Sequence, residues 1–358
     1  MHGGDAPNGM RVFGFPQHGI SYNESFYRAV SAHGVAVEEG EFSGGWLVQN
    51  VKPGDYLHLH WPSFLYATPR SRAALAASFL RFVALLALAR QRGGTLLWTA
   101  HNLMPHDESL LPVLDRIGRR LVIAASARVF VHGTTAGELL VRAYPGVADK
   151  LTSIPHGHWI DDYPHTVTRE QARERLAIPP DAYVYLFIGL CKPYKNVHRL
   201  VEVFRKSGGN AVLVVAGAFQ QEEYRELIVR LAGDDPRIRL VPTFIPDDDM
   251  QSFLGACDIV VAPYREILTS GTAMLAMSFG RPVISIAAGH VSDVVPSECG
   301  ILFEPNDPTG LATALGEART RRFDENVILK HARRFTWQDA AKIFVNALSR
   351  DRARRRPA

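Results

Sequence analysis

The sequence predicts an α/β protein that consists of two doubly wound domains in succession. Short apolar segments that end in turns recur along the chain and alternate with helical segments, a pattern typical of parallel sheets covered on both faces. This alternation stops in residues 153–171, which are rich in proline, histidine and aspartate, and then starts again, which indicates a linker. A chain of 358 residues is also too long for one average core and suits two domains.

The first half alternates strand-like and helix-like segments. Strands are expected at residues 10–16, 55–62, 94–102 and 128–133, and helices at 23–34, 73–89, 115–127 and 135–144. Asn23 and Gly34 are the predicted N-cap and C-cap of the first helix, because these residue types favour those positions. The apolar segment 73–89 contains Arg81 and is shorter than the roughly 20 residues that cross a bilayer, so we expect a half-buried helix.

The second half repeats the pattern after the linker. Strands are expected at residues 183–190, 211–218, 238–245, 258–264, 281–286 and 299–305, with helices between them. In doubly wound sheets ligands bind beyond the carboxyl ends of the strands. The residues that directly follow each strand are therefore where a functional site is expected.

Composition narrows the class of protein. Hydrophobic residues make up 47% and charged residues 21% of the chain, as in soluble globular proteins. Three widely spaced cysteines and the lack of a secretory pattern favour reduced thiols in a cytoplasmic protein. Basic residues are dispersed with no aromatic-basic stripe, so we expect no nucleic-acid partner. The arginine-rich end, residues 350–356, is either a solvated terminus or a contact with anionic lipid.

A cluster of four small polar residues, residues 269–272, stands where a helix is expected to begin. The amino end of a helix has unpaired N–H groups and a partial positive charge, and so attracts phosphate. Gly271 would let an anion approach the backbone, and Ser270 and Thr272 would add hydroxyl donors. Taken alone, the cluster is equally well explained as a simple helix cap.

Two lysines follow the first strand of the same half. In the sequence GLCKPYKN, Lys192 and Lys195 lie on a turn before a helix, where lysines alone would be surface charge. Together with the polar helix start they indicate a clamp for a diphosphate. The P-loop and the GxGxxG pattern are both absent. A diphosphate held by point charges and amides, with no resident cofactor or metal expected, suggests a leaving group that must be stabilised.

The second half resembles the GT-B glycosyltransferases of group 1, which are family-4-like. The matching segments, in order, are IPHG (154–157), FIGLCKPYKNVHRLVEVF (187–204), LVVAG (213–217), FIPDDDMQSFLGACDIVVAPYRE (244–266), SGTAMLAMSFGRPVI (270–284), AGHVSDVV (288–295) and GILFEPNDPTGLATAL (300–315). The resemblance implies two Rossmann-like domains facing a central cleft, with residues 1–160 binding the acceptor and 161–334 the nucleotide sugar. Residues 335–358 would form the family's last helix, which crosses back to the first domain, and the basic tail.

The resemblance also implies roles for the donor-side residues. Lys192 and Lys195 would neutralise the diphosphate of a nucleotide sugar. The expected nucleotide sugar is GDP-mannose, and a UDP-sugar is the next candidate. Further expected contacts are Ser270, Gly271, Thr272 and Gly19 with the diphosphate, and Phe244, Ile245 and Glu266 with the base and ribose. One departure is Leu275, which stands where retaining members usually have a glutamate. That version is similar to a subset of bacterial transferases that includes inverting, mannosyltransferase-like enzymes, so the stereochemical outcome stays open. An inverting enzyme needs a base at the acceptor hydroxyl, whereas a retaining one can use the donor phosphate.

The first half supplies the candidates on the acceptor side. His101 matches the position of a family histidine that reaches the donor sugar, and Asp107 or Glu108 is preferred as the base. Expected contacts with the sugar or acceptor are Asn23, His60, Trp61, Asn102 and His132. For Trp61 the alternative is packing in the core.

Two other functions and one location remain open. A non-catalytic nucleotide-sugar or carbohydrate-binding protein would explain Leu275, and an epimerase would share the architecture. The acceptor is expected to be a glycan, a lipid-linked glycan or a small molecule. The apolar helix, the arginines around it and the arginine-rich tail suggest a peripheral membrane contact at the inner face; those arginines are Arg70, Arg72, Arg81, Arg90 and Arg92.

Overall fold

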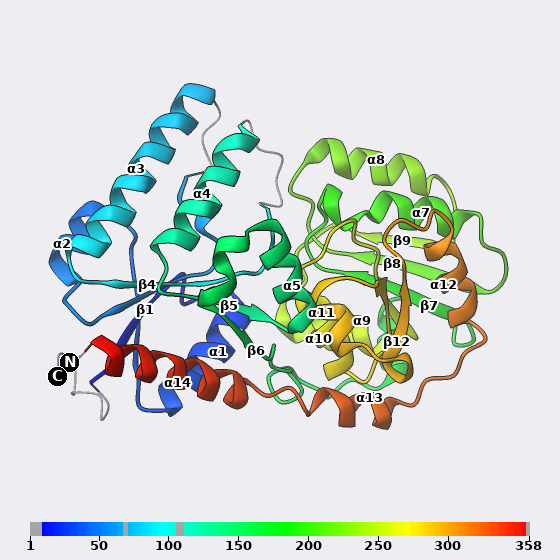
Figure 1. The fold of residues 1–358 in the computed structure, drawn as a ribbon. Coiled ribbons are helices and arrows are strands. Elements are labelled where there is room, and N and C mark those ends of the chain that lie inside the picture. The colour runs from blue at the N-terminus through cyan, green and yellow to red at the C-terminus, as the bar shows by residue number, and fades with distance from the viewer. Residues whose placement is uncertain (1–8, 67–70, 105–110, 356–358) are drawn as a thin grey trace. The chain divides into compact units, whose positions relative to one another are not determined.

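The computed structural model describes residues 9–66, 71–104 and 111–355. Its chain divides into two compact units, Met1–Gly157 with Thr336–Ala358, and His158–Phe335. The sequence-based boundaries fell at residues 160 and 334. The two units are described separately, because each contains its own sheet and core (Figure 1).

The first unit contains a six-stranded parallel sheet in the order β2-β1-β3-β4-β5-β6. Its strands are β1 (Arg11–Phe15), β2 (Ala36–Glu39), β3 (Tyr56–Leu59), β4 (Thr95–Thr99), β5 (Arg128–His132) and β6 (Leu151–Ile154). Strands β3 to β5 are almost fully buried, as expected for a sheet covered on both faces. The strand order reverses between β1 and β3, which makes this a topological switch point.

Helices cover both faces of this sheet. They are α1 (Ser21–Ala32), α2 (Gly44–Asn50), α3 (Arg72–Gln91), α4 (Pro112–Ala125), α5 (Thr134–Ala143) and α14 (Trp337–Arg355), with the short 3₁₀ helices η1 (Pro62–Leu65) and η2 (Pro145–Lys150). Helices α2, α3 and α4 lie on one side of the sheet, and α1 and α14 on the other (Figure 1).

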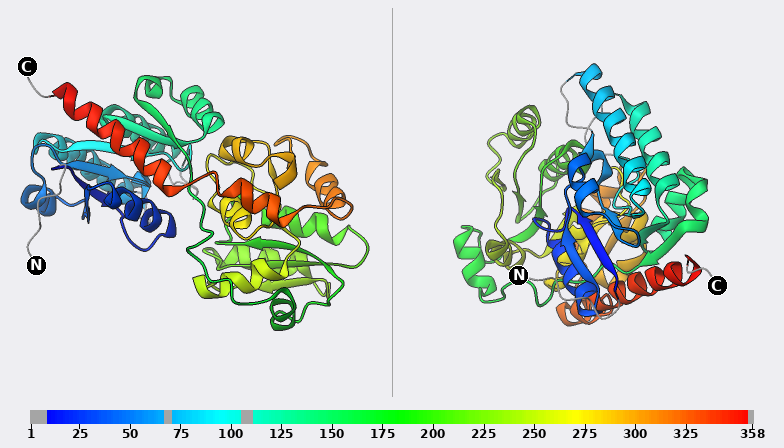
Figure 2. Two further views of the ribbon diagram at one scale, coloured as in Figure 1. Left: turned by 90° about the horizontal axis from the view of Figure 1, so that it is seen from below. Right: turned by 90° about the vertical axis from the view of Figure 1, so that its left-hand side faces the viewer.

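The last helix, α14, belongs to the first unit although it follows the whole second unit in sequence. Both views of Figure 2 show it along the side of the first sheet, where it contacts α1. Phe344 packs its ring edge against Phe26 at 5.2 Å between centroids. Arg128 and Asp351 form an ion pair of 2.7 Å. The expected return of the C-terminal helix to the first domain is therefore confirmed.

The second unit contains another six-stranded parallel sheet, in the order β12-β11-β10-β7-β8-β9. Its strands are β7 (Tyr183–Ile188), β8 (Ala211–Ala216), β9 (Ile238–Val241), β10 (Ile259–Ala262), β11 (Val283–Ile286) and β12 (Gly300–Phe303). Read from β9, this is the 3-2-1-4-5-6 order of a dinucleotide-binding sheet, with the switch point between β7 and β10. The α/β prediction with two doubly wound domains is confirmed.

The second unit contains helices between its strands, and several of them pack against one another. They are α6 (Arg169–Arg175), α7 (Val197–Arg205), α8 (Glu222–Ala232), α9 (Asp247–Ala256), α10 (Gly271–Ser278), α11 (Gly289–Val294), α12 (Gly310–Ala318) and α13 (Glu325–Ala332), with the 3₁₀ helices η3 (Pro193–Lys195) and η4 (Ser297–Cys299). Helix α7 contacts α8 and α12, α6 contacts α9, and α10 contacts α13.

Two local expectations need correction or refinement. The first helix begins at Ser21 after Ile20, so the prediction of Asn23 as its N-cap is wrong. Asn23 is instead buried inside α1, where its amide Nδ2 donates to the Pro16 carbonyl at 2.6 Å. Among the described residues, α3 is the one helix long and apolar enough to cross a membrane, with 33% of that apolar window buried; a core helix passes the same test.

Candidate functional site

The donor-side candidates lie at the switch point of the second sheet, beyond the carboxyl ends of β7 and β10. The turn after β7 is tied to the end of β10 by two hydrogen bonds. Asn196 donates from Nδ2 to the Pro263 carbonyl at 3.0 Å, and the Arg265 N–H donates to the Tyr194 carbonyl at 2.9 Å. Asn196 adopts a left-handed conformation with φ of 61°, which asparagine tolerates better than most residues. This turn therefore carries both predicted lysines to the switch point.

The ammonium group of Lys195 lies over aromatic rings. Its Nζ is 5.5 Å from the ring centroid of Tyr264 and 5.9 Å from that of Phe187. No carboxylate of the described residues forms an ion pair with it. Burial raises the pKa of the neighbouring Cys191 thiol to about 12, so at neutral pH that thiol supplies no negative charge. Lys195 is thus a half-buried cation whose charge is available to an anionic ligand.

The start of α10 offers amide groups to the same place. Ser270 caps the helix by accepting the Ala273 N–H on its hydroxyl at 3.1 Å. Within the part of the chain that the structure describes, the N–H groups of Gly271 and Thr272 have no acceptor. The hydroxyl of Tyr264, whose ring faces the Lys195 ammonium, donates to Thr272 Oγ1 at 3.0 Å. Ser270 therefore acts as a cap, while two further amides remain available for an anion.

The loop that leads into α10 is fixed by a glycine of the next helix. Gly289 has φ of 57°, and a Cβ there would lie 2.6 Å from the carbonyl oxygens of both Ile267 and Leu268. The N–H of His290 donates to the Leu268 carbonyl at 2.9 Å. Only glycine allows this close approach, so α11 holds the start of α10 in position.

The structure brings some donor-side candidates together and leaves others apart. Lys195, Thr272 and the α10 start are joined through Tyr264, and the buried Lys192 lies on the same turn as Lys195. Phe244 and Ile245 follow β9, on the same edge of the sheet but beyond β8; Phe244 is 75% exposed and Ile245 is buried. Their contact with a base, and that of the exposed Glu266 with a ribose, stay predictions.

The acceptor-side histidines gather at the carboxyl ends of neighbouring strands in the first unit. His60 follows β3, His101 follows β4, and His132 ends β5. His60 Nδ1 and His101 Nε2 are 3.0 Å apart, and the His101 and His132 ring centroids are 5.7 Å apart. Trp61 is half-buried and stacks on His101 with centroids 4.4 Å apart, so it belongs to this cluster.

A chain of hydrogen bonds leads from His101 into the core. His60 Nε2 is 2.8 Å from the Tyr27 hydroxyl, which is 2.9 Å from His58 Nδ1, and His58 Nε2 is 2.8 Å from Thr99 Oγ1. Burial lowers the pKa of His58 to about 3 and that of His60 well below its usual range, so both are neutral at pH 7. A neutral imidazole carries one N–H, so all protons in the chain point toward His101 or all point away. The chain thereby couples the tautomer of His101 to those of His60 and His58.

Helix α1 contributes buried polar atoms beside these histidines. The Tyr22 ring meets the rings of His60, His101 and His132 edge to face, at 5.8, 4.7 and 5.3 Å. Within the described ranges the Tyr22 hydroxyl and the Asn23 Oδ1 have no hydrogen-bond partner. Buried polar groups are seldom left unpaired, so these two atoms are candidates for contact with a ligand.

Three more predicted residues have simpler surroundings. Asn102 donates from Nδ2 to the Met104 carbonyl at 2.6 Å. Gly19 has φ of 78° on an exposed loop, and its N–H donates to Glu24 Oε1 at 3.0 Å. Asp107 and Glu108, the candidates for the catalytic base, lie outside the described residues. Among the described residues, no group of three or more His, Cys, Asp or Glu is arranged to hold a metal ion.

Sequence reasoning missed the residues that connect these candidates. Tyr264 and Asn196 bridge the ends of two strands, and Tyr27 and His58 extend the histidine chain. Tyr264 carried the same signal as the lysines, since it follows a strand by two residues. Tyr27 had no such signal in the sequence, because its role depends on how α1 packs on the sheet.

Comparison with known proteins shows which families this chain is similar to. Residues 182–320 match the family model described as glycosyl transferases group 1. A GDP-mannose:glycolipid 4-beta-D-mannosyltransferase from Xanthomonas campestris pv. campestris is 31% identical over 239 residues, which are 64% of this chain and 61% of that protein. A D-inositol 3-phosphate glycosyltransferase from Saccharomonospora viridis is 28% identical over 280 residues, 70% of this chain and 64% of that one. The chain thus spans about three fifths of the length of these curated relatives.

Solved structures share the whole architecture. The sucrose-phosphate synthase from Thermosynechococcus elongatus has a TM-score of 0.70 at 18% identity. The match covers 96% of this chain and 99% of the synthase chain. HepE from Anabaena, in complex with UDP and glucose, has a TM-score of 0.69 at 16% identity, with 95% and 99% covered. At such identities the likeness shows the fold alone. The sheet orders and the returning helix show that this chain has the GT-B fold, and its residues 182–320 match the group 1 glycosyltransferases.

Proposed function

We propose that this protein transfers a sugar from a nucleoside-diphosphate sugar to a glycan or lipid-linked acceptor. The observation that supports this most is the half-buried ammonium of Lys195 beside the free amides of α10. A diphosphate that leaves the sugar gains negative charge on its terminal oxygen. Fixed positive charge and oriented amides stabilise that charge without rearranging, which lowers the barrier to transfer.

For the donor we propose GDP-mannose, with a UDP-sugar as the next candidate. The Xanthomonas campestris relative is a GDP-mannose-dependent mannosyltransferase by its name, and HepE was solved with UDP and glucose. Leu275 is half-buried in α10 and cannot bind a ribose hydroxyl, so the ribose must be held by other groups. Phe244, Ile245 and Glu266 are the proposed contacts with the base and ribose.

On the acceptor side we propose that His101 contacts the donor sugar and that Asp107 or Glu108 takes the proton of the acceptor hydroxyl. The hydrogen-bond chain behind His101 supports a defined role for that side chain, because it couples the proton on the His101 ring to those on His60 and Tyr27. Trp61 stacks on His101 with one face of its ring, and we propose that the other face packs against a sugar. A base is needed because an inverting reaction is proposed for this mannosyltransferase-like chain.

We further propose that the first unit rests on a membrane at the cytoplasmic face, where it meets a lipid-linked acceptor. Exposed apolar side chains occur on four neighbouring elements of this unit: Val48 on α2, Phe64 on η1, Leu80 on α3, and Val113 and Ile117 on α4. Arg72, Arg81 and Arg90 are exposed on α3 itself. Apolar residues interspersed with arginine suit the boundary between lipid head groups and acyl chains. Failure of the full chain to float with anionic vesicles would remove this part of the proposal.

The function is tested by a nucleotide screen followed by a transfer assay. Thermal unfolding is measured with GDP, UDP, ADP and dTDP, each with and without EDTA. We expect GDP to raise the unfolding temperature most and EDTA to leave that rise unchanged. GDP-mannose should then be consumed in the presence of a lipid-linked acceptor. Stabilisation by none of the four nucleotides would refute the proposal, whereas binding without any turnover would favour the non-catalytic alternative raised by Leu275.

A further inference from the structure

The second unit contains an arginine-lined pocket of about 540 Å³ that plays no part in the proposed transfer. We call it the arginine pocket; its basic lining residues are Arg169, Arg281, Arg319, Arg321 and Arg322. Two carboxylates, Asp258 and Glu325, also line it. Five guanidinium groups against two carboxylates leave the pocket with a net positive charge.

The arginine pocket lies at the opposite edge of the sheet from the donor-side candidates. Its wall includes Tyr183, the first residue of β7, and Asp258 and Pro282, which lie at or next to the amino ends of β10 and β11. The donor-side groups follow the carboxyl ends of β7 and β10. A strand rises about 3.3 Å per residue, so the length of β7 separates the two places by about 17 Å. A ligand in the arginine pocket therefore cannot touch the donor-side residues.

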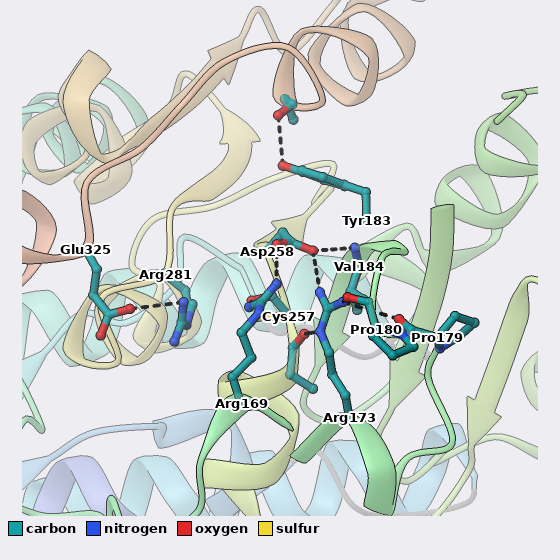
Figure 3. A network of polar contacts seen from close by, with 12 residues as sticks. Arg169, Arg173, Pro179, Pro180, Tyr183, Val184, Cys257, Asp258, Arg281 and Glu325 are labelled. Atoms are coloured by element: carbon teal, nitrogen blue, oxygen red, sulfur yellow. Dashed lines mark hydrogen bonds and ion pairs between the residues drawn. The ribbon is translucent and has the colours of Figure 1, made fainter. Parts of the chain in front are cut away.

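The two carboxylates do not neutralise the pocket. Asp258 is saturated, because it accepts from Arg169, from Arg173 at 3.0 Å and from the Val184 N–H at 2.7 Å (Figure 3). Two arginines thus face this one carboxylate.

Glu325 pairs with Arg281 at 3.2 Å, but its side chain is 52% exposed (Figure 3). An exposed ion pair is weak, so a more highly charged anion can replace Glu325 at Arg281.

Several guanidinium groups have donors to spare. Arg322 is exposed and forms no hydrogen bond or ion pair with the residues that the structure describes. Arg319 uses Nη1 to donate to the Gly208 carbonyl at 2.6 Å, and Arg281 has a buried Nε with no partner in the described chain. Both terminal nitrogens of Arg321 donate hydrogen bonds, one to the Glu317 carboxylate and one to the Ser297 carbonyl, each at 2.7 Å. Since each guanidinium has five N–H donors, Arg322, Arg319 and Arg281 have most of their donors without a partner among the described residues.

We propose that the arginine pocket binds a phosphate-bearing anion, independently of the donor. Planar guanidinium groups match phosphate oxygens two at a time, which favours phosphate over a single-point anion. The pocket is larger than one phosphate requires, so a ligand with two phosphates or a phosphorylated head group fits its volume. Its source is either a free phosphate compound or the head group of a lipid.

The test measures binding of inorganic pyrophosphate to the full chain by calorimetry at low salt. The parent for the comparison carries Lys195→Ala, so that the donor-side groups do not bind the probe as well. Arg322→Gln and Arg322→Glu are compared with Arg230→Gln and Arg230→Glu, matched changes of another exposed arginine on α8. Arg322 has no described partner, so its variants should unfold at the parent's temperature.

We expect pyrophosphate to bind the parent, and Arg322→Gln to weaken that binding about tenfold, the effect of losing one charge-assisted contact. The charge reversal should weaken it further, and the Arg230 variants should match the parent. Absence of binding at about 1 mM pyrophosphate, or equal affinity for Arg322→Glu and Arg230→Glu, would overturn the proposal. Because all arms contain Lys195→Ala, neither result depends on whether the donor proposal is right.

A second arm distinguishes the two sources of the ligand. The same variants are mixed with phosphatidylcholine vesicles that contain phosphatidic acid. Binding that Arg322→Glu abolishes and Arg230→Glu does not would identify a lipid head group. Pyrophosphate binding in solution with no vesicle binding that depends on Arg322 would identify a free phosphate compound.

Discussion

The buried hydroxyl of Tyr27 provides a demanding test of the histidine chain in the first unit. Tyr27→Phe removes one oxygen that pairs with both His58 Nδ1 and His60 Nε2. Both nitrogens lie in residues with no exposed surface, so water cannot replace the lost partner. Each unsatisfied buried group costs about 1–3 kcal/mol, so the free energy of unfolding should fall by about 2–6 kcal/mol. That is a large share of the stability of an ordinary domain.

The assay is urea unfolding followed by tryptophan fluorescence, to which the buried Trp98 of the first sheet contributes. The matched control is Tyr144→Phe, because the Tyr144 hydroxyl donates only to the weak acceptor Sδ of Met104 at 3.3 Å. The control should lose less than about 1 kcal/mol. If Tyr27→Phe were as stable as the control, the two histidines would not depend on that hydroxyl and the chain would be refuted.

Two further predictions concern pH and the loop before α10. His58 and His156 have folded pKa values of about 3 and about 4, below the ordinary 6.5, so the unfolded chain binds more protons and stability is lost as the pH falls from 6.5 toward these values. At pH 5 each should cost about 2 kcal/mol relative to pH 7, and urea midpoints that do not change with pH would contradict this. Gly289→Ala should destabilise the second unit by about 1–3 kcal/mol and weaken GDP binding, because its Cβ would strike the Leu268 carbonyl. The control is Gly316→Ala, where a Cβ meets nothing within 4 Å. It should leave GDP binding unchanged when the binding of GDP to both variants is measured by calorimetric titration.

Local patterns predicted the donor-side candidates because each pattern lies within one strand and the residues that follow it. Lys195 was recognisable on the turn after β7, and Ser270 at a helix start. The links between them were not predictable. Tyr264 contacts both Thr272 and Lys195, and that arrangement depends on β7 and β10 being neighbours although they end at Ile188 and Ala262, far apart in the sequence.

Contacts made by helices were harder still to predict. Asn23 was expected to cap α1, but capping needs a free side chain at the helix start, and Asn23 is instead buried against the Pro16 carbonyl. Tyr22 and Tyr27 meet the histidines only because α1 packs on the sheet beside β3. The ion pairs of Asp258 with Arg169 and Arg173 span more than 80 residues, and no local pattern indicated them.

The central claim is that Lys195 and the start of α10 form a site for the diphosphate of the donor. Calorimetric titration of GDP into the parent, Lys195→Ala and Lys206→Ala tests it most directly, since Lys206 is an exposed lysine at the end of α7. We predict that Lys195→Ala binds GDP about 10- to 100-fold more weakly while unfolding at the parent's temperature, and that Lys206→Ala binds as the parent does. Equal GDP affinity in all three proteins would contradict the claim.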